Sequence, residues 1–293
     1  MRALPRHVLL ALLTIYIVWG STYFAIHVAL QSFPPFILMG SRFLVAGALL
    51  FGWLKWRGTA NPTPRQWRDA GIVGVLLLGG GMGLTAVAQQ YVSSGMTAVF
   101  IACSPMIMSL CAGLFGVWPN KREWTGILAG FGGALLLSGS GELSAQPLGM
   151  MALLGAIVCW DMGSIISQKK CQVAPGAMGF ASEMLLGGVF LIGMAFAKGE
   201  SFSISITLPA FFAWSYLVVA GSLLAFSAYM YLLSKVTPAL ASSYAYVNPV
   251  IAVALGVMLA GEQIEPRALI AIAIILASVA LITLARAPSP EPA

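Results

Sequence analysis

The chain has 293 residues, of which 59% are hydrophobic and only 8% are charged. An ordinary soluble domain carries about 25% charged residues, so this composition excludes a water-soluble globular fold and fits a protein solvated by a lipid bilayer. The net charge of +6 does not indicate nucleic-acid binding, because the basic residues are scattered between apolar runs and form no stripe.

Ten apolar runs are long enough to be membrane-spanning helices, which need about 20 residues each. Short breaks rich in proline, glycine or charge separate these runs. In chain order the expected spans are 8–30, 35–55, 69–89, 94–117, 123–140, 147–168, 177–197, 209–232, 239–260 and 267–285. The predicted fold class is therefore an all-α membrane protein with ten transmembrane helices.

The positions of Lys and Arg set the expected orientation, since cytoplasmic loops carry an excess of these residues. With both termini in the cytoplasm, twelve basic residues fall in inner loops and only Lys198 and Arg267 fall in outer loops. A shift of the frame by one helix would destroy this bias. The sequence therefore predicts a multi-pass protein with both termini cytoplasmic and a disordered cytoplasmic tail over 287–293.

The two halves of the chain are similar to each other. Ser104-Pro105 and Asn248-Pro249 lie 144 residues apart, and Trp19 and Trp160 lie 141 residues apart. Each half holds five expected spans, and because five is odd the second half enters the membrane from the opposite side. Such inverted repeats are typical of secondary transporters, which use them for alternating access. The expected repeats are residues 1–144 and residues 145–286.

Four motifs carry a resemblance to a known family. They are WGSTYF at 19–24, Arg42-Phe43-Leu44, ASSYAYVNPV at 241–250 and Gly261-Glu262. Together they resemble the EamA family, the ten-helix branch of the drug/metabolite transporter superfamily, over both halves of the chain. The resemblance implies a bacterial inner (cell) membrane protein that moves small metabolites or drugs. First halves in this family often carry Gly-Glu at the end of the fourth span, where this chain has Val117-Trp118.

Two prolines lie near the middle of expected spans. Pro105 is 11 residues into the fourth span and Pro249 is about 10 residues into the ninth, which places both about 15 Å deep. A proline in mid-helix removes one hydrogen bond and displaces the carbonyl four residues earlier. Broken helices at matching positions of two repeats point to a central binding site, to which Ser104 and Asn248 would contribute. A tolerated packing kink is the alternative.

Three charged residues lie inside expected spans, where a charge is costly and marks function by default. Arg42 lies about 10 Å from the outer face, and Glu183, its equivalent in the second half, lies about 9 Å from the inner face. Asp161 lies in the inner third of the sixth span. We expect Glu183 to be the proton site of an antiporter and Arg42 to gate it or to hold an anionic substrate group. A structural ion pair or a snorkelling side chain is the alternative.

Aromatic residues at mid-depth complete the expected site, namely Trp19, Trp160, Tyr244 and Tyr246. They are suited to wall a pocket for flat or cationic substrates, and lipid-facing or helix-packing positions are the alternative. The glycine-rich run 79–83 follows no expected strand, so it indicates close helix packing rather than nucleotide binding.

These features predict a secondary-active transporter of small metabolites or drugs, an exporter of amino acids or related amphipathic compounds that is coupled to protons. A channel or facilitator is the alternative. An intramembrane enzyme is disfavoured because the chain has two histidines, neither of them deep, and no HExxH or GxSxG motif. The expected partners are a small-molecule substrate, protons and the lipid bilayer, without nucleic acid, cofactor or metal. A monomer or a weak homo-oligomer is expected.

Overall fold

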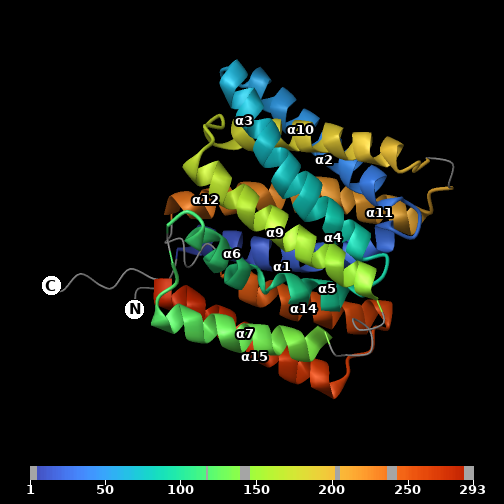
Figure 1. Cartoon of the computed structure of the whole chain (residues 1–293). Coiled ribbons are helices and arrows are strands. Elements are labelled where there is room, and N and C mark those ends of the chain that lie inside the picture. The colour runs from blue at the N-terminus through green and yellow to red at the C-terminus, as the bar shows by residue number, and fades with distance from the viewer. Residues whose placement is uncertain (1–4, 117, 139–145, 202–204, 236–242, 287–293) are drawn as a thin grey trace.

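A computed structural model gives the structure of residues 5–116, 118–138, 146–201, 205–235 and 243–286. Within these ranges every regular element is a helix and no strand occurs. The helices run back and forth between two ends of one bundle, and α1 starts at the same end at which α15 finishes (Figure 1). That end, with Arg6 and Arg286, is called the terminal end below, and the end with Ala29 and Pro266 is called the far end.

The helices of the first half precede residue 145 and those of the second half follow it. In chain order they are α1 (Arg6–Ala29), α2 (Pro35–Trp56), α3 (Pro64–Gly74), η1 (Val75–Met82), α4 (Gly83–Ala88), α5 (Ser94–Ile101), α6 (Ser104–Gly113), α7 (Lys121–Ser138), α9 (Pro147–Lys169), α10 (Ala177–Ala197), α11 (Leu208–Tyr216), η2 (Leu217–Leu224), α12 (Ala225–Lys235), α14 (Tyr244–Ala260) and α15 (Pro266–Arg286).

Seven helical stretches are long and apolar enough to cross a membrane. They are Arg6–Ala29, Pro35–Trp56, Pro64–Ala88, Ser94–Gly113, Pro147–Lys169, Ala177–Ala197 and Leu208–Tyr229. Two shorter apolar helices, Val247–Ala260 and Pro266–Leu281, follow them. The expectation of an all-α membrane protein is confirmed, whereas the number ten and the inverted repeat stay predictions. The tail 287–293 lies outside the described residues.

Proline and short polar residues set where several helices begin. Helices α2, α3 and α9 each carry proline in their first turn, where its missing N–H is not needed. At the start of α3 the Thr63 hydroxyl accepts from the Gln66 N–H at 3.3 Å, and the Gln66 side chain accepts from the Thr63 N–H at 2.9 Å. This reciprocal capping box fixes the start of the helix at the break that the sequence predicts.

Two of the long spans contain a π-helical segment that the sequence analysis did not predict. Segment η1 joins α3 to α4, and η2 joins α11 to α12. The two segments start at Val75 and Leu217, 142 residues apart, which is the spacing of the expected repeats. π-helical turns are rare and are frequent at functional sites, so these segments direct attention to the side chains around them.

The two proline-containing spans differ from each other. Helix α5 ends at Ile101 and α6 begins at Ser104, so the chain is broken just before Pro105. Pro249 instead lies inside α14, which is continuous. The expectation of a broken helix is therefore right at Pro105 and wrong at Pro249. The Asn248 amide accounts for part of this difference, because in its satisfied orientation it donates to the carbonyl of Tyr244 at 3.2 Å and bridges the turn before the proline.

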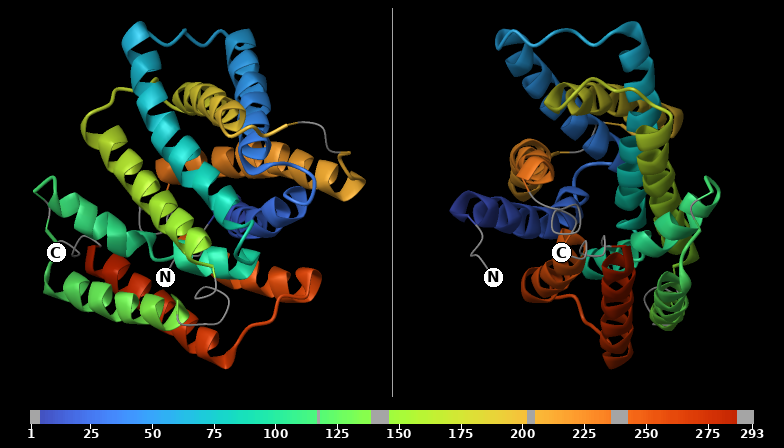
Figure 2. Two further views of the ribbon diagram at one scale, coloured as in Figure 1. Left: turned by 45° about the vertical axis from the view of Figure 1, so that its right-hand side comes forward. Right: turned by 90° about the vertical axis from the view of Figure 1, so that its left-hand side faces the viewer.

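Glycines allow pairs of helices to pack closely. A Cβ at Gly188 of α10 would lie 2.9 Å from Leu44 Cγ and 3.1 Å from the Gly40 carbonyl oxygen of α2. Helices α7 and α15 lie side by side at one edge of the bundle (Figure 2), where a Cβ at Gly133 would lie 2.9 Å from Ile275. Close contact through small residues is typical of helix pairs in membranes.

The α2–α10 contact predicts a clear contrast between two glycines of α10. Gly188→Ala is expected to lower the free energy of unfolding by about 1–3 kcal/mol, because its methyl group overpacks the interface. Gly193→Ala is the matched control, since a Cβ there meets no atom within 4 Å, and it is expected to change stability by less than about 1 kcal/mol. Thermal unfolding in detergent measures both, and equal effects would contradict the close packing.

Candidate functional site

Arg42 is the buried cation around which the candidate site is built. It lies on α2 with 3% of its surface exposed, and its Nε donates to Ser222 Oγ at 3.0 Å. Its guanidinium also lies 5.0 Å from the centre of the Phe43 ring. Among the described residues it makes no ion pair with an acidic side chain. A buried charge without a counter-charge is costly, so its presence indicates a binding role.

Segment η2 supplies the polar groups that meet Arg42. The Ser222 hydroxyl donates to the Leu217 carbonyl at 3.1 Å, and the Trp19 indole N–H donates to the Gly221 carbonyl at 3.2 Å. A Cβ at Gly221 would lie 3.1 Å from the guanidinium of Arg42, so only glycine leaves room for it. The π-helical segment thus brings side chains of α1 and α2 to one point.

Three aromatic rings surround this point. The ring centre of Trp19 lies 4.8 Å from that of Tyr244 and 5.3 Å from that of Tyr229, and the two tyrosine rings are 5.8 Å apart. The Asn248 amide joins the same group, because it donates to the carbonyl of Tyr16 at 3.2 Å. The expectation that Trp19 and Tyr244 share one wall is met by this geometry. The side chain of Tyr246 lies outside the described residues.

Asp161 forms the second polar centre. It is fully buried on α9, and its Oδ1 accepts from the Ser104 hydroxyl at 2.6 Å. Its Oδ2 has no hydrogen-bond partner within the described part of the chain. Because Ser104 is the first residue of α6, this bond ties the break before Pro105 to α9. Asp161 and Tyr244 also interact electrostatically, which places the carboxylate beside the aromatic group.

Trp160 and Glu183 lie apart from these two centres. Trp160 packs on η1, where a Cβ at Gly81 would lie 3.0 Å from its ring, and about a third of its surface is exposed. Glu183 is buried on α10, and no hydrogen bond or ion pair of its side chain is found among the described residues. Although α2 and α10 are packed side by side, Arg42 turns toward η2, so an Arg42–Glu183 ion pair is absent from the described structure.

The sequence analysis missed Gly221, Ser222 and Tyr229. A signal for the first two was present, since Gly221-Ser222 lies 141 residues after Gly80-Gly81, at the spacing that relates Trp19 to Trp160. Each tryptophan packs against the equivalent pair in the other half, Trp19 on Gly221 and Trp160 on Gly81. Tyr229 had no such signal, because its role depends only on its packing against α1 and α14.

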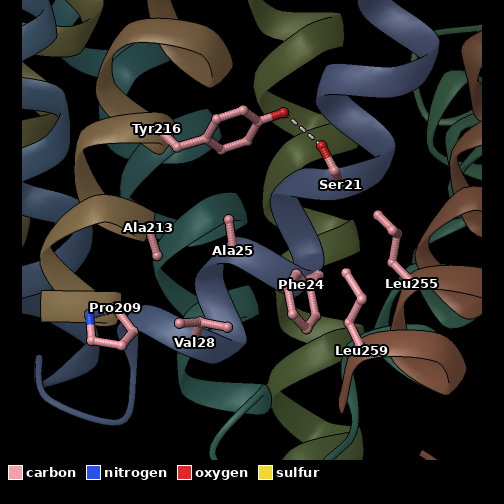
Figure 3. A pocket seen from close by; sticks show the side chains of 9 residues that line it. All are labelled: Ser21, Phe24, Ala25, Val28, Pro209, Ala213, Tyr216, Leu255 and Leu259. Carbon is pink, nitrogen blue, oxygen red and sulfur yellow. Dashed lines mark hydrogen bonds between the residues drawn. The ribbon is translucent and has the colours of Figure 1, made fainter. Parts of the chain in front are cut away.

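An apolar pocket of about 350 Å³ lies between α1, α11 and α14. Its polar groups are Ser21 and Tyr216, whose hydroxyls are 2.6 Å apart at one end of the pocket (Figure 3). The remaining lining residues are Phe24, Ala25, Val28, Pro209, Ala213, Leu255 and Leu259. This pocket offers no charge to orient a polar ligand, so the Arg42 and Asp161 centres form the candidate site. No cluster of three metal-ligating side chains occurs in the described ranges.

Proteins similar to this chain are transporters. The family model described as "EamA-like transporter family" matches residues 6–139 and again residues 147–284. The inner membrane transporter YedA of Escherichia coli K12, described as uncharacterized, is 41% identical over 94% of this chain and 90% of YedA. An uncharacterized transporter of Archaeoglobus fulgidus is 26% identical over 83% and 85% of the two chains. A crystal structure with 20% identity aligns over 94% of this chain and 97% of its own with a TM-score of 0.65, and so shares its fold.

The Ser104–Asp161 bond predicts energetic coupling between α6 and α9. Ser104→Ala is expected to lower the free energy of unfolding by about 1–3 kcal/mol, because it leaves a buried carboxyl without its donor. In a double-mutant cycle with Asp161→Asn the two changes should be non-additive by at least about 0.5 kcal/mol. Ser227→Ala is the control, since Ser227 bonds only its own helix and should be additive with Asp161→Asn. Additivity of both pairs in thermal unfolding would contradict the coupling.

Proposed function

This chain belongs to the EamA-like transporter family, and on that premise we propose that it is a secondary-active exporter of amino acids or related amphipathic metabolites. It is a multi-pass membrane protein. The proposal places it in the bacterial inner membrane with both termini cytoplasmic, as the distribution of basic residues favours. The double match of the family model and the π-helical segments 142 residues apart support two inverted repeats, 1–144 and 145–286.

The buried, unpaired guanidinium of Arg42 is the observation that carries the proposal. A substrate carboxylate would give it a bidentate partner, the strongest kind of charge-assisted hydrogen bond. The free Oδ2 of Asp161 would receive a substrate ammonium group, and Trp19 and Tyr244 would flank the apolar part of the substrate. A carboxylate, an ammonium and an apolar side chain are the three parts of an amino acid.

The remaining residues of the proposed site are assigned by their position. Ser104 and Pro105 form the break opposite the aromatic rings, and Asn248 and Pro249 follow Tyr244 on α14. Trp160 and Tyr246 are proposed as further walls. In alternating access the two halves rock about this fixed site, and the α5/α6 break and both π-helical segments are the points at which these helices are most easily bent.

The function is tested by counterflow in proteoliposomes loaded with a mixture of amino acids. A carrier shows trans-stimulation of labelled amino-acid uptake, and a channel or facilitator does not. Arg42→Lys is expected to raise KM by roughly 10- to 100-fold, since loss of the planar fork removes about 1.5–3 kcal/mol of binding. Arg57→Gln is the control, because Arg57 is exposed and stacks only on Trp53. Unchanged exchange in Arg42→Lys would remove Arg42 from the site.

Proton coupling is proposed to reside at Glu183, a buried carboxyl without a hydrogen bond among the described residues. Glu183→Gln is expected to abolish uptake driven by a pH gradient and to preserve amino-acid exchange, because the amide keeps the shape but does not titrate. Asp161→Asn, measured in parallel, should reduce both activities, since Asp161 is proposed to bind substrate. If pH-driven uptake survives in Glu183→Gln and only Asp161→Asn abolishes it, the coupling site is Asp161.

A further inference from the structure

Glu262 joins the second half of the chain to the first at the far end of the bundle. It follows α14, and its Oε1 accepts from the N–H and the hydroxyl of Ser94 at 2.8 and 2.7 Å, while its Oε2 accepts from the Gly95 N–H at 3.0 Å. Ser94 and Gly95 are the first two residues of α5. A carboxylate in this place satisfies free N–H groups and interacts favourably with the helix dipole.

Glu200 makes the same kind of contact at the same end. It follows α10, and its two carboxylate oxygens accept from the N–H groups of Phe36 at 3.2 Å and Ile37 at 2.9 Å. These residues are in the first turn of α2, the helix that carries Arg42. Two helices of the first half therefore have their N-termini held by glutamates of the second half.

The backbone around Glu262 is shaped to deliver its carboxylate. Gly261 has a φ of +67°, in the left-handed region that favours glycine, and ends α14. The Glu262 N–H then donates to the Gly256 carbonyl at 3.0 Å, which closes the helix end and turns the side chain back. A Cβ at Gly256 would collide with the Glu262 carboxyl, and one at Gly95 would lie 3.0 Å from Oε2.

The terminal end lacks the counterparts of both contacts within the described residues. Helix α10 occupies the place of α2 in the second half, and its N-terminus has no side-chain cap. The position 144 residues before Glu262 is Trp118, which accepts no hydrogen bond. A different link between the halves occurs at both ends. It is the Ser32–Thr207 hydroxyl pair at the far end and the Gln172 N–H on Asp69 at the terminal end.

We propose that Glu200 and Glu262 are positioning residues that latch the far end closed, and that both must leave the helix N-termini when that end opens. The proposal rests on the alternating-access function proposed above. In the structure described here both latches are made, so the far end is closed. Removing either is expected to shift the ratio of far-open to far-closed molecules about tenfold, which is ~1.4 kcal/mol.

The test measures access to a cysteine from each side without any substrate. In a chain freed of its native cysteines, Thr22→Cys reports on the far side, since Thr22 is buried beside Gly221. A chain that keeps only Cys111 of α6 reports on the terminal side. Labelling uses a membrane-impermeant maleimide on right-side-out and inside-out vesicles. Glu262→Gln and Glu200→Gln should raise far-side labelling about tenfold and lower terminal-side labelling.

The controls separate a latch from a general loss of packing. Glu265→Gln removes a nearby exposed carboxylate without side-chain hydrogen bonds among the described residues, and it should change neither rate. Gly95→Ala crowds the Glu262 carboxylate and should reproduce the effect of Glu262→Gln if that variant folds poorly. Unchanged far-side labelling, or a rise at both reporters, would overturn the latch. Failure of counterflow with these labelling changes intact would instead refute the carrier function.

Discussion

Hydrocarbon offers no partner to a backbone N–H or C=O, and this constraint governs every irregular point of the chain. The turn before Pro105 is closed by the Cys103 N–H on the Phe100 carbonyl. In η1 the Thr85 hydroxyl donates to the Gly81 carbonyl, and in η2 the Ser222 hydroxyl donates to that of Leu217. Each interruption of a helix therefore requires its own polar side chain, and these side chains gather where the helices are interrupted.

The candidate site follows from that requirement. Ser222 serves a carbonyl of η2 and at the same time accepts from Arg42, so the group that repairs the backbone also orients the buried cation. Ser104 does the same for the α5/α6 break, because it is both the first residue of α6 and the donor to Asp161. Side chains with two partners can exchange one of them for a substrate group at small cost, which is what a site that opens to both sides in turn needs.

Much of this arrangement is readable from sequence, and the limits have physical causes. Apolar length and terminal prolines gave the helices, and the cost of a charge in hydrocarbon marked Arg42 and Asp161. The π-helical segments were not predictable, since one added residue per turn leaves no trace in composition. The partners of Arg42 and Glu262 were missed because Ser222 and Ser94 lie 180 and 168 residues away in the chain, a pairing that only the packed helices create.

Pseudo-symmetry also explains why a few unmatched residues carry unusual weight. In a carrier built from inverted repeats, the two access states exchange the roles of the halves, so identical halves would make the two states equal in energy. Any preference must then come from positions at which the halves differ. Glu262 against Trp118 is such a position, and so is the capped start of α2 against the uncapped start of α10. Because a population follows the energy difference exponentially, two carboxylates at one end are enough to decide which side of the membrane the resting protein faces.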